Sequence, residues 1–533
     1  MGHLWQSLSE HLRGLSRKII SLSSSIVDHV TLKRLHEDEN SDNEEEEDDD
    51  DDDLDSLDID PFEAVLERVK VKHIGKYVAA IRAKTQPNGK KSIPVSEVES
   101  PTRCGEHVCY RVKFADGVSW LLKVPIIGTP DQFDEDDGEA LRSEALTMIM
   151  LRRETTIPIS EVFSYDNTCK NKLKVPFILL EFIDALPLVD VWHDRESPKE
   201  VVQARRTRCL QDIAAAYIQL GKYTFNEETF LRFDDQDCLI GVVPVRKDLF
   251  SGLRGACTSY LDLREEKSKK YERGLLKLLR MFVDWTPKSS GGESFVLSHP
   301  NPGIFSFLLS KDGSVRAILD WHGASAKPPS IGNETYPLWL MRDWAGALYR
   351  WSEEMEQGIK DESCMWEDSP DTLMFYREIY AQCIANLRPE SENAKLTRNS
   401  LLFEHLAMAM EDSIFGFSIA LKILNEIRKQ VKKSVDDNDQ PASVNPSNNN
   451  TDDNDSKNQS SAKGKDAMGD HNSPNKTEVK EEHDDAEPDI DREDEEEEEE
   501  FDAVQFLDDL DDDGMSEDQE KIFKAGFEAL FIS

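Results

Sequence analysis

The chain has 533 residues, of which 38% are hydrophobic, so it can form a sizeable core and two or three domains. The formal net charge of −43 is unevenly distributed. Residues 37–60 carry 17 Asp or Glu and no Lys or Arg, and residues 434–520 carry 33 acidic against six basic residues, so the remainder is close to neutral. We expect no nucleic-acid partner, because the charge excess is acidic. No apolar run reaches the length of about 18 residues that a membrane-spanning helix needs.

The eight Cys residues are scattered, with no C-x-x-C pair and no His at ligand spacing, so a zinc site is not expected. A chain of this length needs no disulfides for stability, and we interpret the cysteines as free thiols in a reducing compartment. The N-terminus lacks the compact apolar core of a secretory signal. The sequence therefore predicts a cytoplasmic or nuclear protein, with a mitochondrial location as the alternative.

That alternative depends on residues 1–36, where apolar side chains recur every three or four positions and predict an amphipathic helix. The helix would pack on the core or on a partner. Because Arg13, Arg17 and Lys18 outnumber the acidic residues near them, the same segment is also compatible with a mitochondrial presequence.

The two acidic segments cannot bury apolar surface and repel themselves, so we predict a disordered linker at 37–60 and a disordered tail at 434–515. Such segments could bind basic proteins through salt-sensitive attraction, or they could simply keep the protein soluble. The last segment, 516–533, differs, because Ser516 and Gln519 form a capping box ahead of an apolar stripe. It predicts an amphipathic helix that docks on this chain or on a partner.

Between the acidic segments, the sequence predicts a β-rich lobe at 61–180 and a helical lobe at 181–433. In the first lobe, an Asp-Gly turn separates two β-rich runs and indicates a hairpin. The elements expected there are a helix at 62–83, strands at 109–114 and 118–124, a helix at 138–153 and a strand at 176–182.

The second lobe begins with a capping box at Ser197 that predicts a helix to about Tyr223. A short β unit follows, with FVLSHP, FSFLLS and VRAILDW. The remaining helices are expected at 264–284, 336–358, 368–387 and 400–433.

Two residues in the first lobe suggest phosphate chemistry. Lys123 lies in the strand after the Asp-Gly turn, and Glu144 lies in the helix that follows. Phosphoryl transfer depends on holding phosphates, placing a metal ion and accepting a proton from the attacking hydroxyl. Either residue alone could be a surface charge, but their order and spacing favour a phosphate-binding Lys with its partner Glu.

The chain at this point resembles the aminoglycoside/choline-type phosphotransferase family, particularly its large fungal branch. The resemblance covers roughly residues 100–345 and implies an α+β, bilobal, protein-kinase-like fold with ATP and Mg²⁺ as cofactors. The matching segments are DGVSWLLKVP, SEALTMIML, TTIPISEVF, VPFILLEFIDALPLVDVW, and LSHP with ILDW followed by KPP.

The family's catalytic loop reads H-x-D-x-x-x-x-N, and a metal-binding Asp follows in I-x-D-W. In this chain His299 and Asp320 are retained, but the base position is Asn301 and the metal-ligand position is Ser306. An Asn side chain is not a base at neutral pH, and losing a general base typically costs about 10²–10⁴ in rate. Ser is also a shorter and weaker metal ligand than Asn.

Other family positions are altered as well. Where the family usually has a glycine after the hinge, this chain has Ala185. Where the family has an acidic residue after the ILDW tryptophan, this chain has His322. The resemblance places Glu181 at the hinge, where backbone groups would meet an adenine.

We therefore interpret the chain as a catalytically impaired, pseudokinase-type protein that binds a nucleotide or metabolite through Lys123, Glu144 and Asp320 and acts as a scaffold or regulator. The alternatives are a working ATP-dependent small-molecule phosphotransferase, in which His322 substitutes for the missing base, and a protein whose acidic segments bind basic partners.

Overall fold

The computed structural model describes residues 60–85, 93–242, 270–287, 294–361, 364–388, 393–411, 413–439 and 502–531. The predicted helix at 1–36, almost all of the linker and most of the acidic tail lie outside these ranges, so their predicted binding to basic proteins stays a prediction. The chain divides into two compact units, residues 1–431 with 504–533 and residues 432–503. The candidate functional residues all belong to the first unit.

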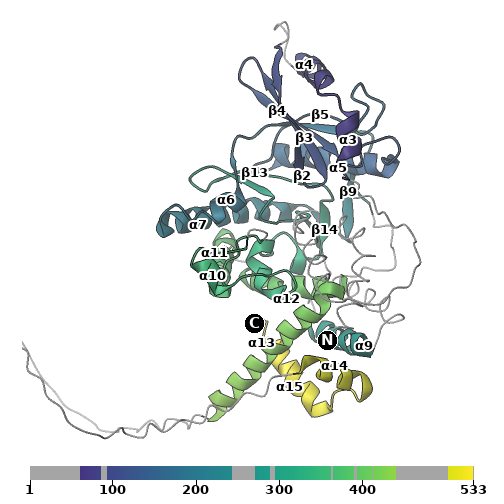
Figure 1. Cartoon of the computed structure of the whole chain (residues 1–533). Helices are drawn as coiled ribbons and strands as arrows, with labels where there is room; N and C mark the ends of the chain where they lie inside the picture. The colour runs from purple at the N-terminus through teal and green to yellow at the C-terminus, as the bar shows by residue number, and fades with distance from the viewer. Residues whose placement is uncertain are drawn as a thin grey trace, which may run out of the picture. The chain divides into compact units, whose positions relative to one another are not determined.

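An antiparallel six-stranded sheet forms the β-rich lobe, with the order β1-β3-β4-β6-β5 and with β2 also paired to β3 (Figure 1). The predicted Asp-Gly turn joins β3 to β4, and Gly117 there has a φ of 86°, which glycine adopts without a steric penalty. The strands are β1 (Val95–Val98), β2 (Thr102–Cys104), β3 (His107–Phe114), β4 (Ser119–Pro125), β5 (Val162–Asp166) and β6 (Phe177–Glu181).

Helices bury both faces of this sheet. On one face, Ile74 and Val78 of α4 (Val71–Thr85) are fully buried and belong to a core cluster with Tyr110 and Leu122 of the strands. On the other face, α5 (Glu135–Glu154) contributes to a second cluster that includes Ile178 of β6. Because alternate residues of a strand point to opposite faces, Leu122 of β4 belongs to the first cluster while Leu121 packs against the second.

The predicted helix at 62–83 is two helices. The first, α3 (Glu63–Arg68), ends at Val69, whose extended backbone (ψ 107°) interrupts the helix before α4 begins. Val65 of α3 and Ile74 of α4 are both fully buried, and a run of apolar residues in the sequence does not reveal a break between two helices that bury the same face.

The second lobe surrounds two small sheets with the orders β10-β9-β14-β11-β8 and β13-β12-β7. Its strands are β7 (Leu186–Pro187), β8 (Thr224–Phe225), β9 (Thr229–Phe233), β10 (Leu239–Val242), β11 (Phe295–Ser298), β12 (Phe307–Leu309), β13 (Val315–Ile318) and β14 (Ser325–Lys327). Its helices are α6 (Leu188–Trp192), α7 (Lys199–Tyr217), α9 (Lys270–Trp285), α10 (Glu353–Glu356), α11 (Pro370–Leu387), α12 (Asn393–Glu411) and α13 (Ser413–Asp439), with 3₁₀ turns η1 (Ile218–Lys222), η2 (Pro329–Ile331) and η3 (Leu338–Trp344).

Three helix predictions in this lobe were wrong in detail. The predicted capping box at Ser197 does not form: Pro198 is the N-cap of α7 without a side-chain cap, and Ser197 Oγ instead accepts a hydrogen bond from Arg205 (3.2 Å). The region 336–358 contains only η3 and the short α10. The predicted helix at 400–433 is two helices, α12 and α13.

The acidic tail was also predicted too long. Residues 434–439 continue α13, and residues 503–512 form α14 (Ala503–Asp512), in which Leu507 and Leu510 are buried. Because α14 contains many Asp residues, its short apolar stripe was not recognised in the sequence. Asp511 of α14 forms ion pairs with Arg273 (2.8 Å) and Lys277 (2.7 Å) of α9. This carboxylate therefore helps to hold α14 against α9.

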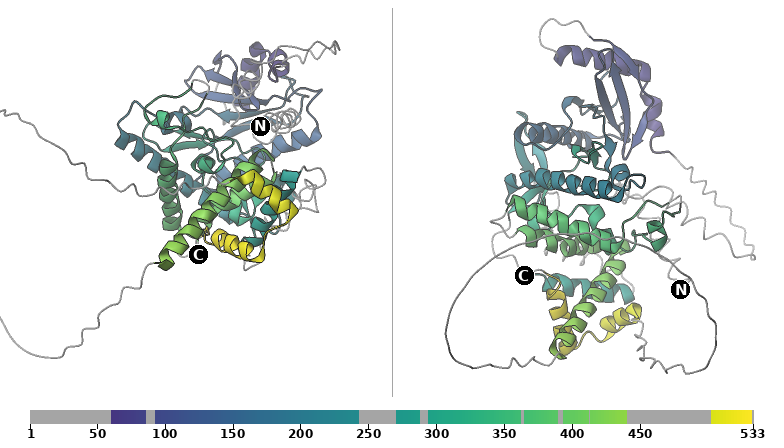
Figure 2. Two further views of the ribbon diagram at one scale, coloured as in Figure 1. Left: turned by 60° about the horizontal axis from the view of Figure 1, so that its bottom comes forward. Right: turned by 90° about the vertical axis from the view of Figure 1, so that its left-hand side faces the viewer.

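The predicted terminal helix is present as α15 (Glu517–Glu528), with the capping box between Ser516 and Gln519 formed as expected. It docks on this chain beside α9 and α13 (Figures 1 and 2). Phe527 is fully buried and stacks on Phe282 of α9, with a centroid distance of 5.1 Å and an interplanar angle of 2°.

The β-rich first lobe and the mainly helical second lobe confirm the predicted α+β, bilobal, kinase-like fold class. Within the described residues, no helix is both long and apolar enough to cross a bilayer.

We expect Phe527→Ala to lower the free energy of unfolding by about 3–5 kcal/mol, because it removes a fully buried ring that holds α15 on α9. Ile522→Ala in the same helix is the matched control. That side chain is 51% exposed, and its loss should change the free energy by less than about 0.5 kcal/mol. Equal effects of the two substitutions in urea denaturation would show that α15 does not dock in this way.

Candidate functional site

Lys123 and Glu144 form a buried ion pair between β4 and α5. The distance from Lys123 Nζ to Glu144 Oε1 is 2.8 Å, and the side chains are only 10% and 3% exposed. Lys123 lies on the sheet face that points away from α4, because its neighbours Leu122 and Val124 occupy the α4 face. The structure thus brings together the two residues that the sequence paired.

Asp320 completes a three-residue cluster. Its Oδ1 lies 3.4 Å from Lys123 Nζ, and its side chain is 57% exposed. The residue has a φ of 56°, a left-handed conformation that is uncommon outside glycine and often occurs at functional sites. Burial alone would lower the pKa of Lys123, but the charges of Glu144 and Asp320 outweigh burial and raise this pKa. Lys123 therefore carries its full positive charge at neutral pH.

The loop that contains Asn301 lies next to Asp320. His299 Nε2 bonds to the carbonyl oxygen of Leu319 (2.7 Å), and the backbone N–H of Leu319 donates to the carbonyl oxygen of Ser306 (2.8 Å). Leu319 directly precedes Asp320 in the chain, so these two bonds fix the loop against the metal-type carboxylate. Asn301 thus belongs to a loop that is bonded to the residue preceding Asp320.

His299 organises the loop and is neutral. It is buried between Tyr217 and Trp321, and its Nδ1 accepts the backbone N–H of Asn301 (3.2 Å). Burial lowers the pKa of His299 to about 4. A neutral ring can accept at Nδ1 while it donates from Nε2 to Leu319, so the observed bonds agree with this protonation state.

Ser306, at the metal-ligand position, is used within the loop. Its Oγ donates to the carbonyl oxygen of Asn301 (2.8 Å), and the residue is only 2% exposed. Its hydroxyl thus stabilises the loop backbone. In the part of the chain that the structure describes, no group of three or more His, Cys, Asp or Glu side chains could hold a metal ion.

Glu181 ends β6, at the predicted hinge. Its backbone N–H donates to the carbonyl oxygen of Glu161 (2.8 Å), and its side chain pairs with Arg152 at 3.5 Å. This N–H is therefore engaged in the sheet.

Three further residues lie near Lys123: His322, which the sequence offered as an alternative base, and two cysteines that sequence reasoning did not assign. Nδ1 of His322 lies 3.8 Å from Glu144 Oε2, so Glu144 faces a second nitrogen besides Lys123 Nζ. Cys109 stands directly opposite Lys123 in the β3–β4 register, and Cys104 follows on β2. Strand alternation places Cys109 and Lys123 on one face, and this signal could have been read from the predicted hairpin.

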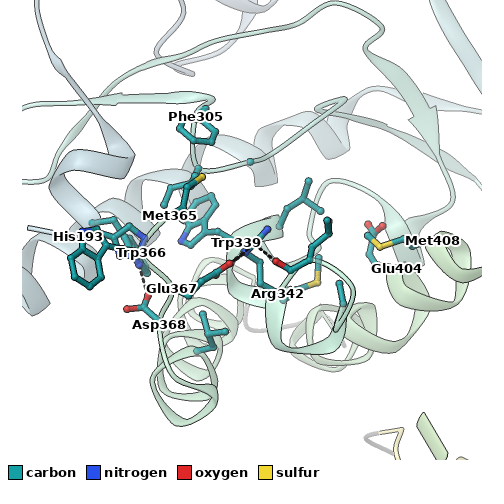
Figure 3. A pocket seen from close by; sticks show the side chains of 18 of the residues that line it. His193, Phe305, Trp339, Arg342, Met365, Trp366, Glu367, Asp368, Glu404 and Met408 are labelled. Atoms are coloured by element: carbon teal, nitrogen blue, oxygen red, sulfur yellow. Dashed lines mark hydrogen bonds and ion pairs between the residues drawn. The ribbon is translucent and has the colours of Figure 1, made fainter. Parts of the chain in front are cut away.

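A separate cavity of about 90 Å³ is lined in part by residues 303–305, which follow Asn301 in the loop (Figure 3). Phe305 of the loop and Trp339 of η3 line it, and the bidentate Arg342–Glu367 ion pair crosses its wall with Nε–Oε1 and Nε–Oε2 distances of 2.8 Å. None of the cluster residues at 123, 144 and 320 lines this cavity, so it is distinct from the Lys123 site.

No family model matches the chain. Among curated proteins, "Altered inheritance of mitochondria protein 9, mitochondrial" of Candida albicans is 26% identical over 163 residues, which are 30% of this chain and 25% of that protein. The protein of the same name from Candida tropicalis is 25% identical over 179 residues, which are 33% of this chain and 28% of its own length. The match thus spans about a quarter of the curated relatives.

The solved structures that resemble the chain are phosphotransferases and kinase-like enzymes. A Ralstonia eutropha protein assigned as an aminoglycoside phosphotransferase has a TM-score of 0.40 and 16% identity, covering 69% of this chain and 91% of its own. A macrolide 2'-phosphotransferase of Brachybacterium faecium has a TM-score of 0.37 and 14% identity, covering 65% and 97%. Amicoumacin kinase, solved with AMP-PNP and Ca²⁺, has a TM-score of 0.36 and 10% identity, covering 66% and 87%.

At these scores the fold class rests on this chain's own geometry. The sheet order, the two lobes and the Lys123–Glu144 pair beside Asp320 define a protein-kinase-like α+β protein.

We expect Lys123→Met to lower the free energy of unfolding by about 3–5 kcal/mol, because Glu144 would stay buried without its partner. Adding Glu144→Gln should restore most of this loss, since the double variant removes both charges. Additive losses of the two substitutions in a double-mutant cycle would contradict a coupled buried pair.

Proposed function

We propose that this chain is a kinase-like protein that holds the phosphates of a nucleotide at Lys123 and is impaired in phosphoryl transfer. The observation that carries the proposal is the intact Lys123–Glu144–Asp320 cluster beside a loop with Asn301 at the base position. The cluster supports the proposed binding of phosphates, and Asn301 in the loop supports the proposed impairment of phosphoryl transfer.

The residues of the cluster fit a nucleotide with its divalent cation. The Lys123 ammonium has three N–H donors, of which two face Glu144 and Asp320, so one is left for a phosphate oxygen. Glu144 fixes the direction of the ammonium group. Asp320 has an exposed carboxylate of the type that Mg²⁺ prefers. When bound, such a cation would neutralise phosphate charge.

Asn301 explains the proposed impairment. The Asn301 amide cannot accept the proton of an attacking hydroxyl. The imidazole of His299 in the same loop is hydrogen-bonded to backbone groups at both nitrogens. The alternative of a working phosphotransferase rests on the loose transition state of phosphoryl transfer, for which positioning can supply much of the acceleration. His322, which the alternative uses as a base, faces Glu144.

We expect ATP with Mg²⁺ to raise the melting temperature of the protein, and we expect Asp320→Asn to abolish the Mg²⁺-dependent part of this shift. Asp320→Asn leaves the Lys123–Glu144 pair intact, so it should not unfold the protein. Lys113→Ala is the matched control, since Lys113 of β3 in the same sheet pairs with Glu97 and Glu99 near the surface. A melting temperature that does not change when ATP is added would contradict the proposed nucleotide site.

We expect Asn301→Asp to raise the rate of ATP turnover by about 10²-fold or more, because it returns a carboxylate to a loop that already lies beside Asp320. The double variant with Asp320→Asn should return to the parental rate. High turnover in the parent that Asp320→Asn abolishes would instead establish the working phosphotransferase.

We also propose a mitochondrial location. The curated relatives carry this location in their name, whereas the comparisons give no support to the cytoplasmic or nuclear expectation. The basic residues Arg13, Arg17 and Lys18 on an apolar repeat are the sequence feature that agrees with it.

We expect a fluorescent reporter fused after residue 36 to enter mitochondria, because residues 1–36 combine positive charge with an apolar stripe. Replacing Arg13 and Arg17 by Glu should keep the same reporter in the cytosol. Equal distribution of both fusions in fractionated cells would argue against import through this segment.

A further inference from the structure

Two cysteines share a sheet face with Lys123. In the β2–β3 hairpin, Cys104 pairs with His107 and Thr102 pairs with Cys109, and in the next pair Cys109 stands opposite Lys123. Residues directly opposite one another share a face, as do alternate residues of one strand. Cys104, Cys109 and Lys123 therefore lie in a diagonal row on the face that meets Asp320.

The two thiols differ in exposure and in acidity. A hydrogen bond from the Cys109 thiol lowers the pKa of Cys104. Burial and the charge of Asp320 oppose this effect, and the charge of Lys123 reinforces it. The same hydrogen bond and burial raise the pKa of Cys109. Cys104 is exposed and Cys109 is 5% exposed. An accessible thiol with thiolate character next to a buried one is the arrangement of an attacking cysteine with its resolving partner.

We propose that Cys104 and Cys109 are a redox modification site in which a hydroperoxide forms a reversible disulfide that closes the nucleotide site. The regulatory part of this proposal rests on the proposed function of Lys123. The disulfide itself does not.

The chemistry needs only the two thiols and the hydroperoxide. The Cys104 thiolate attacks the peroxide, so that an S–O bond forms, the O–O bond breaks and the alkoxide or hydroxide leaves. The Cys109 sulfur then attacks the resulting sulfenic acid, so that the S–S bond forms, the S–O bond breaks and water leaves. The thiols lose two electrons, the peroxide gains them, and a thiol reductant reverses the step.

Closing this bond must move the hairpin. Diagonal residues in an antiparallel pair lie about 7–8 Å apart, whereas disulfides join Cα atoms that are about 4.4–6.8 Å apart. Oxidation would therefore pull the end of β2 by about 1 Å towards β3. Because Cys109 stands directly opposite Lys123, this movement brings the tip of the hairpin over the ammonium group and narrows the space for a phosphate.

The test uses the full chain and hydrogen peroxide, and one tryptic peptide reports the reaction. Cleavage after Arg103 and Arg111 releases residues 104–111, which contain both cysteines. We expect this peptide to lose the mass of two hydrogens after peroxide treatment and to regain it after dithiothreitol. The matched control is Cys238, an exposed thiol whose Sγ lies 3.9 Å from the carbonyl oxygen of Gln236. Cys238 should still react with an alkylating reagent after peroxide treatment.

The second readout is the melting-temperature shift with ATP and Mg²⁺. We expect the oxidised protein to need about tenfold more ATP for a half-maximal shift, and dithiothreitol to restore the reduced behaviour. Cys104→Ser and Cys109→Ser should each remove both effects of peroxide. Cys104→Ser changes an exposed residue and is the variant that tests the proposal without risk to the core.

The outcomes separate the two proposals. An unchanged 104–111 peptide at a peroxide concentration that oxidises Cys238 would overturn the disulfide. Disulfide formation with an unchanged ATP titration would overturn its control of the site. Absence of any ATP shift in the reduced protein would count against the proposed function, while the peptide mass would still decide whether the disulfide forms.

Discussion

The ion pair between Lys123 and Glu144 is the constraint on which the candidate site depends. Both side chains are buried, and a buried charge is tolerated only with a partner, so the pair holds β4 against α5 in one geometry. Replacing such a pair by apolar residues would often stabilise a protein. Its presence in the core, with a half-exposed carboxylate beside it at Asp320, is thus better explained by binding than by stability.

The neighbouring loop is tied to the segment that carries Asp320. His299 anchors the loop to Leu319, which directly precedes Asp320. The Ser306 hydroxyl supports the loop backbone through the carbonyl oxygen of Asn301. In the function that we propose, the residues that would hold phosphate are therefore distinct from the loop residue that would have to accept a proton.

Much of this was predictable from the sequence, because the relevant signals are local. The Asp-Gly turn and the order of strand and helix singled out Lys123 and Glu144, and the family resemblance pointed to Asp320 in the ILDW segment. The break at Val69 and the 3₁₀ turn at 338–344 were missed, because they depend on which faces the tertiary structure covers. The helix α14 was missed because Asp511 and its acidic neighbours masked a short apolar stripe, and its partners on α9 are more than two hundred residues away in sequence.

The central claim is that the chain binds ATP but transfers its phosphate slowly. Phosphorus NMR of ATP and Mg²⁺ with a stoichiometric amount of protein measures both properties in one sample. The account predicts broadened or shifted phosphate resonances that stay constant in intensity over hours. Sharp resonances identical to those of free ATP, or the steady growth of ADP and phosphate signals, would contradict it.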